Sequence, residues 1–192
     1  MKKINDNKLI IAITGASGSI YGIRLLEYLK RLKIETHLIL SKSALITINT
    51  ELDYKISEIK SLADYNYHPN DIAAKISSGS FRVSGMIIAP CSMNTLAQIA
   101  GGYESNLISR AASVIIKERK KLALMVRETP LDSIHLENML KLSNCGVNIF
   151  PPVPAFYNHP KSLDDIVNHS IARLLDLFDI DIDYAKRWEG IS

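Results

Sequence analysis

Two ionisable residues, Arg127 and Glu128, stand side by side directly after residues 122–126, an apolar run that is typical of a buried strand. A guanidinium group can donate two parallel hydrogen bonds to a phosphate, and a neighbouring carboxylate can accept or return a proton. A cation and an acid held together at the rim of a sheet therefore predict chemistry on a phosphate-bearing ligand. Pro130 is expected to start a helix, because proline is favoured at the first helical position.

A glycine-rich loop, residues 14–22, is the second chemical feature. It follows a predicted strand and opens a predicted helix, so its backbone N–H groups and the helix dipole can hold an anion or a polar ring edge. Its Gly-x-x-Gly-x-x-x-Gly spacing differs from the dinucleotide pattern, and the second strand ends in Ser41, Lys42 and Ser43 where a nicotinamide-binding fold usually has an acid. The loop favours a mononucleotide phosphate, with a ligand-free tight turn as the alternative. Ser17 is not expected to be a hydrolase nucleophile, because Ser19 stands where that motif needs glycine.

A second loop, residues 90–95, offers small hydroxyl and amide side chains after another predicted strand. Such residues can cap a helix and also face a ligand, although Ser92 or Asn94 taken singly could be only an N-cap. Two such loops imply one shared cleft. Cys91 has no His paired with it locally, so packing is favoured over a catalytic thiolate, and Cys91 and Cys145 are both expected to be reduced and packed.

Residues 106–120 form a predicted helix that is apolar around most of its circumference and carries two cations. Arg110 and Lys117 are seven residues apart, which places them about 10 Å apart on one stripe. They could reach solvent along the surface or, if they face a cleft, bind an anion. The histidines, cysteines and acids show no metal-ligand spacing, so metal-free chemistry is expected.

The elements that must position these residues alternate along the chain. Apolar runs and helical patterns follow one another in the order expected of βαβ units. The runs are continuously apolar, which is typical of strands in a parallel sheet that is covered on both faces. We therefore expect an α/β fold with a doubly wound parallel sheet, Rossmann-like or flavodoxin-like, and ligands beyond the carboxyl ends of the strands. The strands are expected at residues 9–14, 36–40, 86–89, 122–126 and 147–150, and the first helix at residues 20–32.

Two stretches depart from this alternation. Residues 54–80 are the least periodic and are expected to carry a helix and a loop. Residues 151–160 cannot be helical, because their prolines remove donors and fix φ, so they form a stiff connector that presents Phe156 and Tyr157. Ser162 and Asp165 then form a capping box for a last helix that runs to about Phe178.

Composition fits a single domain spanning residues 1–192. The chain is 47% hydrophobic and 22% charged, which suits one compact core. The formal net charge is only +3, and no basic block is interleaved with aromatic residues, so nucleic acid is not expected as a partner. The lack of a signal layout or a long apolar span predicts a soluble, cytoplasmic protein with no membrane association.

Five motifs together resemble the UbiX-type flavin prenyltransferase family: residues 14–18, 85–96, 117–119, 127–130 and 151–157. The resemblance covers nearly the whole chain in order. It implies a Rossmann-like subunit of a homododecamer, with FMN at the strand ends and active sites completed by neighbouring subunits. It also implies that dimethylallyl monophosphate alkylates reduced FMN at N5 and then C6, releasing phosphate, and that a UbiD-type decarboxylase receives the prenylated flavin.

The resemblance assigns roles to individual residues. Tyr157 and Arg173 would hold the dimethylallyl phosphate, and Lys117 would lie near the same phosphate. Arg110 and Glu51 would line the site, and Glu128 matches the proposed proton-transfer group. The residues that would contact FMN are Gly15, Ala16, Ser17, Ser41, Ser92, Met93, Asn94, Thr95 and Arg127, and the catalytic set would be Glu128, Ser17, Lys117 and Arg127. Two departures from the family pattern are Val126, where many members have proline, and Ser113, where many have an acid.

Physical chemistry is consistent with this assignment. Breaking an allylic C–O bond builds negative charge on the departing phosphate, which Lys117, Arg127 and Arg173 could stabilise. An apolar pocket formed by Met93, Phe156 and Tyr157 would exclude water. Two alternatives remain: an FMN-dependent decarboxylase of a cysteine substrate, which usually needs a His near the start of the chain although none precedes His37 here, and a non-catalytic flavin carrier for a decarboxylase.

Overall fold

The computed structural model describes residues 8–182, so both ends of the predicted domain lie outside the described residues. Its centre is a six-stranded sheet in the order β3-β2-β1-β4-β5-β6, in which all neighbouring strands are parallel. This is the strand order of the Rossmann sheet, so the expected doubly wound α/β fold is confirmed. The strands are β1 (Lys8–Ile13), β2 (Glu35–Leu40), β3 (Tyr65–Tyr67), β4 (Gly85–Cys91), β5 (Lys121–Val126) and β6 (Asn148–Ile149).

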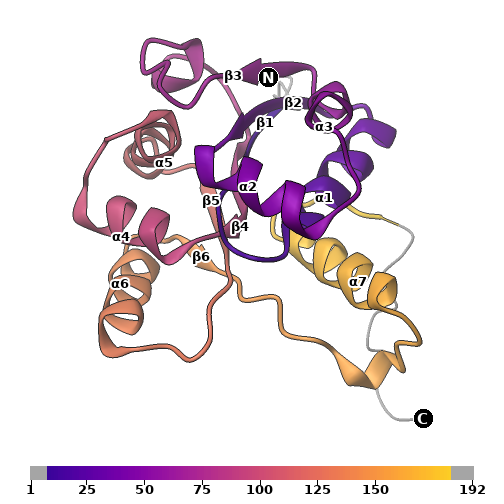
Figure 1. Cartoon of the computed structure of the whole chain (residues 1–192). Coiled ribbons are helices and arrows are strands. Elements are labelled where there is room, and N and C mark those ends of the chain that lie inside the picture. Colours follow the sequence, from indigo (N-terminus) through magenta and orange to yellow (C-terminus); the bar gives the residue numbers. More distant parts are fainter. Residues whose placement is uncertain (1–7, 183–192) are drawn as a thin grey trace.

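Helices cover both faces of this sheet (Figure 1). One face carries α1 (Ser19–Arg31), α2 (Lys42–Glu51), α3 (Ile56–Leu62) and α7 (Leu163–Asp176). The other carries α4 (Met93–Gly101), α5 (Leu107–Lys117) and α6 (Ser133–Asn144). Within the described chain, no helix has the length and apolar content needed to cross a bilayer.

The continuous apolar runs of the strands follow from these two covered faces. In β1, Leu9, Ile11 and Ile13 belong to the hydrophobic core on the α1 side, whereas Ile10 and Ala12 belong to the core on the α5 side. Side chains alternate between the two faces of a strand, so every position must be apolar when both faces are buried.

The strand β3 (Tyr65–Tyr67) was not predicted from the sequence. Residues 54–80 contain the expected helix, α3, but also β3, a three-residue strand at the edge of the sheet, and the short 3₁₀ turn η1 (Lys75–Ser77). The register pairs His37 with Tyr65 and Ile39 with Tyr67. A strand this short at an edge leaves no run of buried residues, and its two tyrosines and one asparagine gave no strand pattern.

Two helix boundaries also differ from expectation. The helix predicted for residues 106–120 ends at Lys117. The expectation that Pro130 starts a helix is wrong, because α6 begins at Ser133 with Asp132 as its N-cap. The Asp132 carboxylate accepts a hydrogen bond from the His135 N–H at 2.8 Å, and this cap fixes the start of α6 three residues after the proline.

The last helix and the connector before it lie close to their predicted positions. The Ser162 hydroxyl accepts from the Asp165 N–H at 3.1 Å, and the Asp165 carboxylate accepts from the Ser162 N–H at 3.0 Å, which completes the predicted capping box. The helix ends at Asp176, two residues before the expected Phe178. The connector leaves β6 and reaches α7 across the lower part of Figure 1. Its one regular element is the 3₁₀ turn η2 (Phe156–Asn158).

Candidate active site

Thr14 joins the two loops that follow the neighbouring strands β1 and β4. Its hydroxyl donates to the carbonyl oxygen of Pro90 at 2.8 Å and accepts from the N–H of Ser92 at 2.8 Å. Its own N–H donates to the same carbonyl at 3.2 Å, and the residue is 1% exposed. The two loops predicted to share a cleft are therefore held together at their roots. Their strands form the switch point of the sheet, where chain connections diverge to opposite faces and ligands of this fold class bind.

The first turn of α1 already holds an anion, and that anion is Glu51. Its carboxylate accepts from the Gly18 N–H at 3.0 and 3.2 Å and from the Ser19 N–H at 3.0 Å. Gly18 has a φ of 100°, a conformation that favours glycine. The expectation that these amides hold a ligand phosphate is therefore wrong at Gly18 and Ser19. The carboxylate comes from the far end of α2, which the loop spacing could not indicate.

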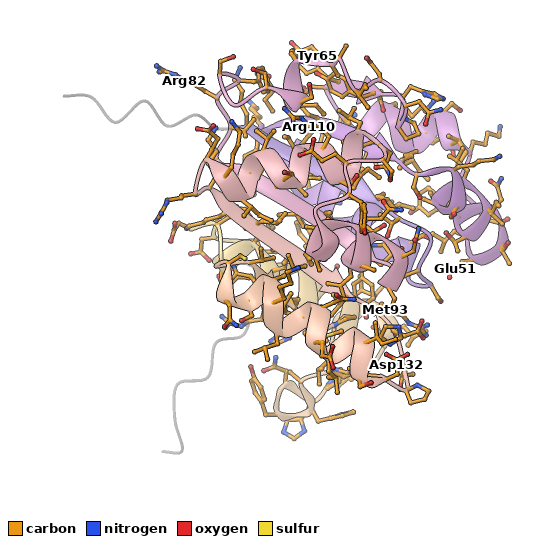
Figure 2. The ribbon with its side chains drawn as sticks, turned by 90° about the vertical axis from the view of Figure 1, so that its left-hand side faces the viewer. Glu51, Tyr65, Arg82, Met93, Arg110 and Asp132 are labelled. Carbon is orange, nitrogen blue, oxygen red and sulfur yellow. The ribbon has the colours of Figure 1, made fainter. Side chains whose placement is uncertain are left out.

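Glu51 also contacts Ser17. Burial by itself would raise the pKa of the Glu51 carboxyl, but hydrogen bonds from the Ser17 hydroxyl and from the Ser19 and Gly18 amides lower it overall. Glu51 is thus an anion at neutral pH that orients the exposed Ser17 hydroxyl. The structure brings Glu51 to the predicted site. Figure 2 shows Glu51, Met93 and Asp132 along one side of the molecule and Arg82, which precedes β4, toward the opposite side.

Three helices begin at this edge of the sheet. Ser41 caps α2 by accepting from the Ala44 N–H at 3.0 Å, and Ser92 caps α4 by accepting from the Thr95 N–H at 3.3 Å. The Ser92 and Thr95 hydroxyls also lie 3.1 Å apart, and Asn94 is exposed beside them. The positive ends of α2 and α4 therefore lie at the same rim as the start of α1, whose first-turn amides bind Glu51, and small polar side chains line this rim. This donor set fits the phosphate and polar ring edge of FMN.

Arg127 and Glu128 follow β5 at the same edge. The Arg127 N–H donates to the carbonyl of Cys91 at 3.2 Å, which extends the pairing of β5 with β4 beyond the strand. Both side chains are exposed, and the Glu128 carboxylate accepts from the Thr129 N–H at 2.9 Å. The two residues stand together at the rim of the sheet, as predicted, and within residues 8–182 no ion pair joins them. Successive side chains of an extended segment project in opposite directions, which lets the two residues serve different partners.

The pKa of Tyr21 indicates that the Arg127 side chain lies near this tyrosine. Burial raises the pKa of the Tyr21 hydroxyl, while a hydrogen bond with Ser170 and the positive charge of Arg127 oppose that rise. Tyr21 lies on α1 and Ser170 on α7, so the charge of Arg127 is felt on the face of the sheet that carries these two helices. No pattern in the sequence indicates this proximity.

Tyr157 and Arg173 are brought together through α7. The Tyr157 ring meets the His169 ring edge-on, with centroids 6.0 Å apart and an interplanar angle of 87°. Arg173 lies one helical turn after His169, forms an ion pair with Asp176, and its charge lowers the pKa of His169. The two residues predicted to hold one phosphate therefore flank the same histidine. His169 was not predicted as a site residue, although its four-residue spacing from Arg173 could have indicated it.

Arg110 and Lys117 lie on α5 and share one acidic neighbour. Arg110 donates to the Glu104 carboxylate at 2.7 Å and to the Ser77 carbonyl at 3.3 Å. Hydrogen bonds from Ser113 and Arg110, together with the charges of Arg110 and Lys117, lower the pKa of Glu104. The predicted common stripe is thus present, and Glu104 supplies a carboxylate beside Ser113, where the family pattern has an acid.

Lys117 is nevertheless far from Arg127 within one chain. Lys117 precedes the start of β5 by four residues, and Arg127 directly follows its end. Six residues at about 3.3 Å each place Lys121 and Arg127 roughly 20 Å apart. The Lys117 ammonium forms an ion pair with Glu118 at 3.0 Å. A single chain therefore cannot bring both cations to one phosphate.

The two cysteines differ in environment. Cys91 is fully buried, and burial raises the pKa of its thiol, which agrees with the predicted packing role. Cys145 is exposed at the end of α6, so the expectation that it is packed is wrong. Among residues 8–182, no group of three or more histidine, cysteine, aspartate or glutamate side chains converges as a metal site would require.

Comparisons with known proteins agree with this geometry. The Flavoprotein family model matches residues 1–175. A "Probable UbiX-like flavin prenyltransferase" of Bacillus subtilis is 54% identical over 96% of this chain and 91% of the relative. The crystal structure of AnUbiX (PadA1) in complex with FMN and dimethylallyl pyrophosphate superposes with a TM-score of 0.95 at 51% identity, covering 96% of this chain and 98% of that one.

A second solved structure is that of a dodecameric FMN-dependent UbiX-like decarboxylase from Escherichia coli O157:H7. It has a TM-score of 0.94 at 53% identity and covers 95% of this chain and all of that one. The peptidyl-cysteine decarboxylase EpiD is only 21% identical, with a TM-score of 0.64, and shares the fold alone. The strand order, the two joined loops and the close relatives together show that the chain belongs to the Flavoprotein family and, within it, to the UbiX-like flavin prenyltransferases.

Proposed function

We propose that this protein transfers a dimethylallyl group from dimethylallyl monophosphate to reduced FMN, without a metal ion. The observation that carries the proposal is the pair of loops joined by Thr14 at the switch point of the sheet, in a chain 51% identical to a protein crystallised with FMN and a dimethylallyl donor. When bound, reduced FMN supplies the electron-rich N5 and C6 atoms that take the allyl group. The residues of this chain bind, orient and neutralise charge.

The loops hold the flavin in this proposal. The residues proposed to contact FMN share the rim where α1, α2 and α4 begin, and the Arg127 guanidinium adds a cation there. Glu51 holds the Ser17 side chain at this rim by a hydrogen bond. These residues are Gly15, Ala16, Ser17, Ser41, Ser92, Met93, Asn94, Thr95 and Arg127.

Cations take the place that metal ions have in other prenyl transferases. Negative charge grows on the phosphate as the allylic C–O bond breaks, and fixed positive side chains lower that barrier. Arg173, which lies on α7 one turn after the His169 that packs against Tyr157, is proposed to hold the phosphate, and Glu128 is proposed to transfer the proton. Tyr157, 47% exposed, and Phe156, 73% exposed, would shield the allyl group once a ligand covers them.

Lys117 must then come from another copy of the chain, and Arg110, on the same helix, is proposed to come with it. Because Lys117 lies at the opposite end of β5 from Arg127, the proposed phosphate site needs at least two subunits. We propose a homo-oligomer, and a dodecamer in particular, as in the related dodecameric structure. A UbiD-type decarboxylase as the recipient of the product and a cytoplasmic location remain predictions.

A cysteine decarboxylase is less well supported. The first histidine of the chain, His37, has a fully buried side chain whose two ring nitrogens are bonded to Glu35 and Tyr67. It cannot serve as an accessible base. A non-catalytic flavin carrier remains the alternative that experiment must separate from the enzyme.

Single-turnover incubation under anaerobic conditions separates them. The protein is mixed with reduced FMN and dimethylallyl monophosphate, or with the diphosphate in a parallel sample, and the extracted flavin is weighed by mass spectrometry. The enzyme adds one C5 unit to the flavin, and the two samples show which donor it uses better. A carrier returns unmodified FMN from both samples.

Glu128→Gln tests the proposed proton-transfer group. The carboxylate does not bind FMN in this proposal, so the variant should keep FMN affinity while ring formation slows at least about a hundredfold, which is the lower end of general acid–base contributions. FMN titration and quenched-flow product analysis check the two effects. Equal losses of affinity and rate would assign Glu128 to structure.

A further inference from the structure

His169 is a titratable residue that the proposed reaction does not yet use. It lies on α7 between the two residues proposed to hold the phosphate, with Tyr157 against its ring and Arg173 one turn further along the helix. Its Nε2 atom is buried and has no hydrogen-bond partner within the described part of the chain. A buried ring nitrogen without a partner costs free energy, so another contribution of this side chain must account for its presence.

That contribution is the packing of the His169 ring against Tyr157. The centroid distance of 6.0 Å and the angle of 87° are those of an edge-to-face aromatic pair. Tyr157 stands on a single 3₁₀ turn in a connector whose other residues belong to no helix or strand, and its neighbours Val153 and Phe156 are 71% and 73% exposed. A rigid helix that presents a ring to Tyr157 therefore restricts where the tyrosine can point.

Burial, helped by the charge of Arg173, keeps the His169 ring neutral. Burial lowers its pKa most, the charge of Arg173 lowers it further, and Asp176 opposes both. From α1, the nearby groups are otherwise engaged: Tyr21 is hydrogen-bonded to Ser170, and Arg24 forms an ion pair with Asp164 at 2.8 Å. A neutral ring can pack against Tyr157 without bringing a second positive charge beside Arg173.

We propose that His169 is a positioning residue: its ring holds Tyr157 in the orientation that binds the phosphate of the prenyl donor. This inference rests on the proposed function. It makes two specific demands. First, donor affinity must depend on the aromatic ring of His169 and not on its nitrogen atoms. Second, His169 must affect donor affinity through Tyr157.

Three variants test the first demand in the full-length, FMN-loaded protein. Dimethylallyl monophosphate is titrated calorimetrically into protein holding oxidised FMN, which is too electron-poor to be alkylated, so binding is read without turnover. His169→Ala should weaken donor binding about tenfold, a loss typical of an aromatic pair contact, while FMN affinity stays unchanged. His169→Phe should restore donor binding to within twofold and should melt no lower than wild type, since it removes the unpaired nitrogen. His159→Asn, at an exposed histidine of the same connector, is the matched control and should change neither affinity.

A double-mutant cycle tests the second demand. In a Tyr157→Ala background, His169→Ala should cause no further loss of donor affinity, because the residue through which it acts is gone. Independent, additive losses would overturn the proposal, and so would an unchanged donor affinity in His169→Ala or a failure of His169→Phe to restore it. Wild-type protein that binds FMN but no dimethylallyl monophosphate would overturn the proposed function itself, and with it this inference.

Discussion

At the scale of single residues, the site depends on side chains that hold backbone in place. Thr14 and Glu51 each satisfy two backbone groups from other segments, one across two strands and the other across a loop and a helix. Such contacts link distant parts of the sequence, so residue type alone could not indicate them. Thr14 was read only as the first residue of a glycine loop, and Glu51 only through a family resemblance.

Thr14→Val should destabilise the protein and weaken FMN binding together. Valine keeps the shape of threonine but leaves the Ser92 N–H without its partner and removes one of the two hydrogen bonds that the Pro90 carbonyl accepts, which costs about 1–3 kcal/mol for buried polar groups. Denaturant unfolding and FMN titration measure the two effects. Thr14→Ser keeps the hydroxyl and should retain FMN affinity; an equal loss in both variants would mean that the methyl group, not the hydroxyl, holds the loops.

Glu51→Gln should lower stability in a manner that depends on pH. The folded pKa of Glu51 lies below its ordinary value, so its stabilisation is complete above that value and is lost as pH falls through the lowered pKa. The exposed position limits the effect to about 0.5–1 kcal/mol near neutral pH. Melting curves of both proteins should differ at pH 7 and converge as the pH falls through the lowered pKa of Glu51. A constant difference across this range would contradict the role of charge.

At the scale of elements, what could be predicted followed burial. β1, β2, β4 and β5 were recognised because both of their faces are covered, and α7 because its capping box lies within four residues of sequence. β3 was missed because a three-residue edge strand is held by its neighbour and by side-chain contacts. The start of α6 was misplaced because the Asp132 cap, not the nearby proline, decides where that helix begins.

The side chains that hold β3 centre on His37. Its ring stacks on Tyr65 at 4.8 Å, meets Phe81 edge-on at 5.0 Å, and bonds Tyr67 and Glu35 at 2.9 and 3.0 Å. Burial lowers the pKa of His37 and raises that of Tyr67 to about 12, so both are neutral at pH 7. Contacts between these aromatic rings thus hold the edge strand β3 in place, and within them the His37 ring resists protonation.

His37→Phe should flatten the acid side of the stability profile. Below its ordinary pKa of 6.5 the unfolded chain binds a proton that folded His37 resists, so wild-type stability falls as pH drops from about 7 to 5. The variant lacks this loss, and its melting temperature should fall less over the same range. His159→Asn, at an exposed histidine, serves as control and should keep the wild-type slope. Identical slopes for His37→Phe and wild type would show that His37 titrates normally when folded.

At the scale of the whole molecule, the proposed site extends beyond one chain. The sequence predicted a ring of Lys117, Arg127 and Arg173, and residue types alone could not show that the length of β5 separates the first two. The separation follows from the topology, because α5 returns the chain to the amino end of β5 before the strand crosses to the carboxyl edge. The sequence could therefore indicate these three cations, but not that they must come from more than one subunit.

Mixed oligomers test whether Lys117 and Arg127 meet between copies. Lys117→Ala and Arg127→Ala should each be inactive alone, whereas co-expression in equal amounts should restore about a quarter of wild-type turnover, since random pairing leaves that share of sites with both cations. Native mass spectrometry verifies the mixing. No recovery in verified mixed assemblies would place both side chains in one subunit's site.

The length of β5 has a further meaning for how this protein can be controlled. If Lys117 of every subunit completes the active site of a neighbour, only the oligomer is active and an isolated subunit is not. Dilution below the threshold of association would then stop turnover, so the abundance of the protein would itself control its activity.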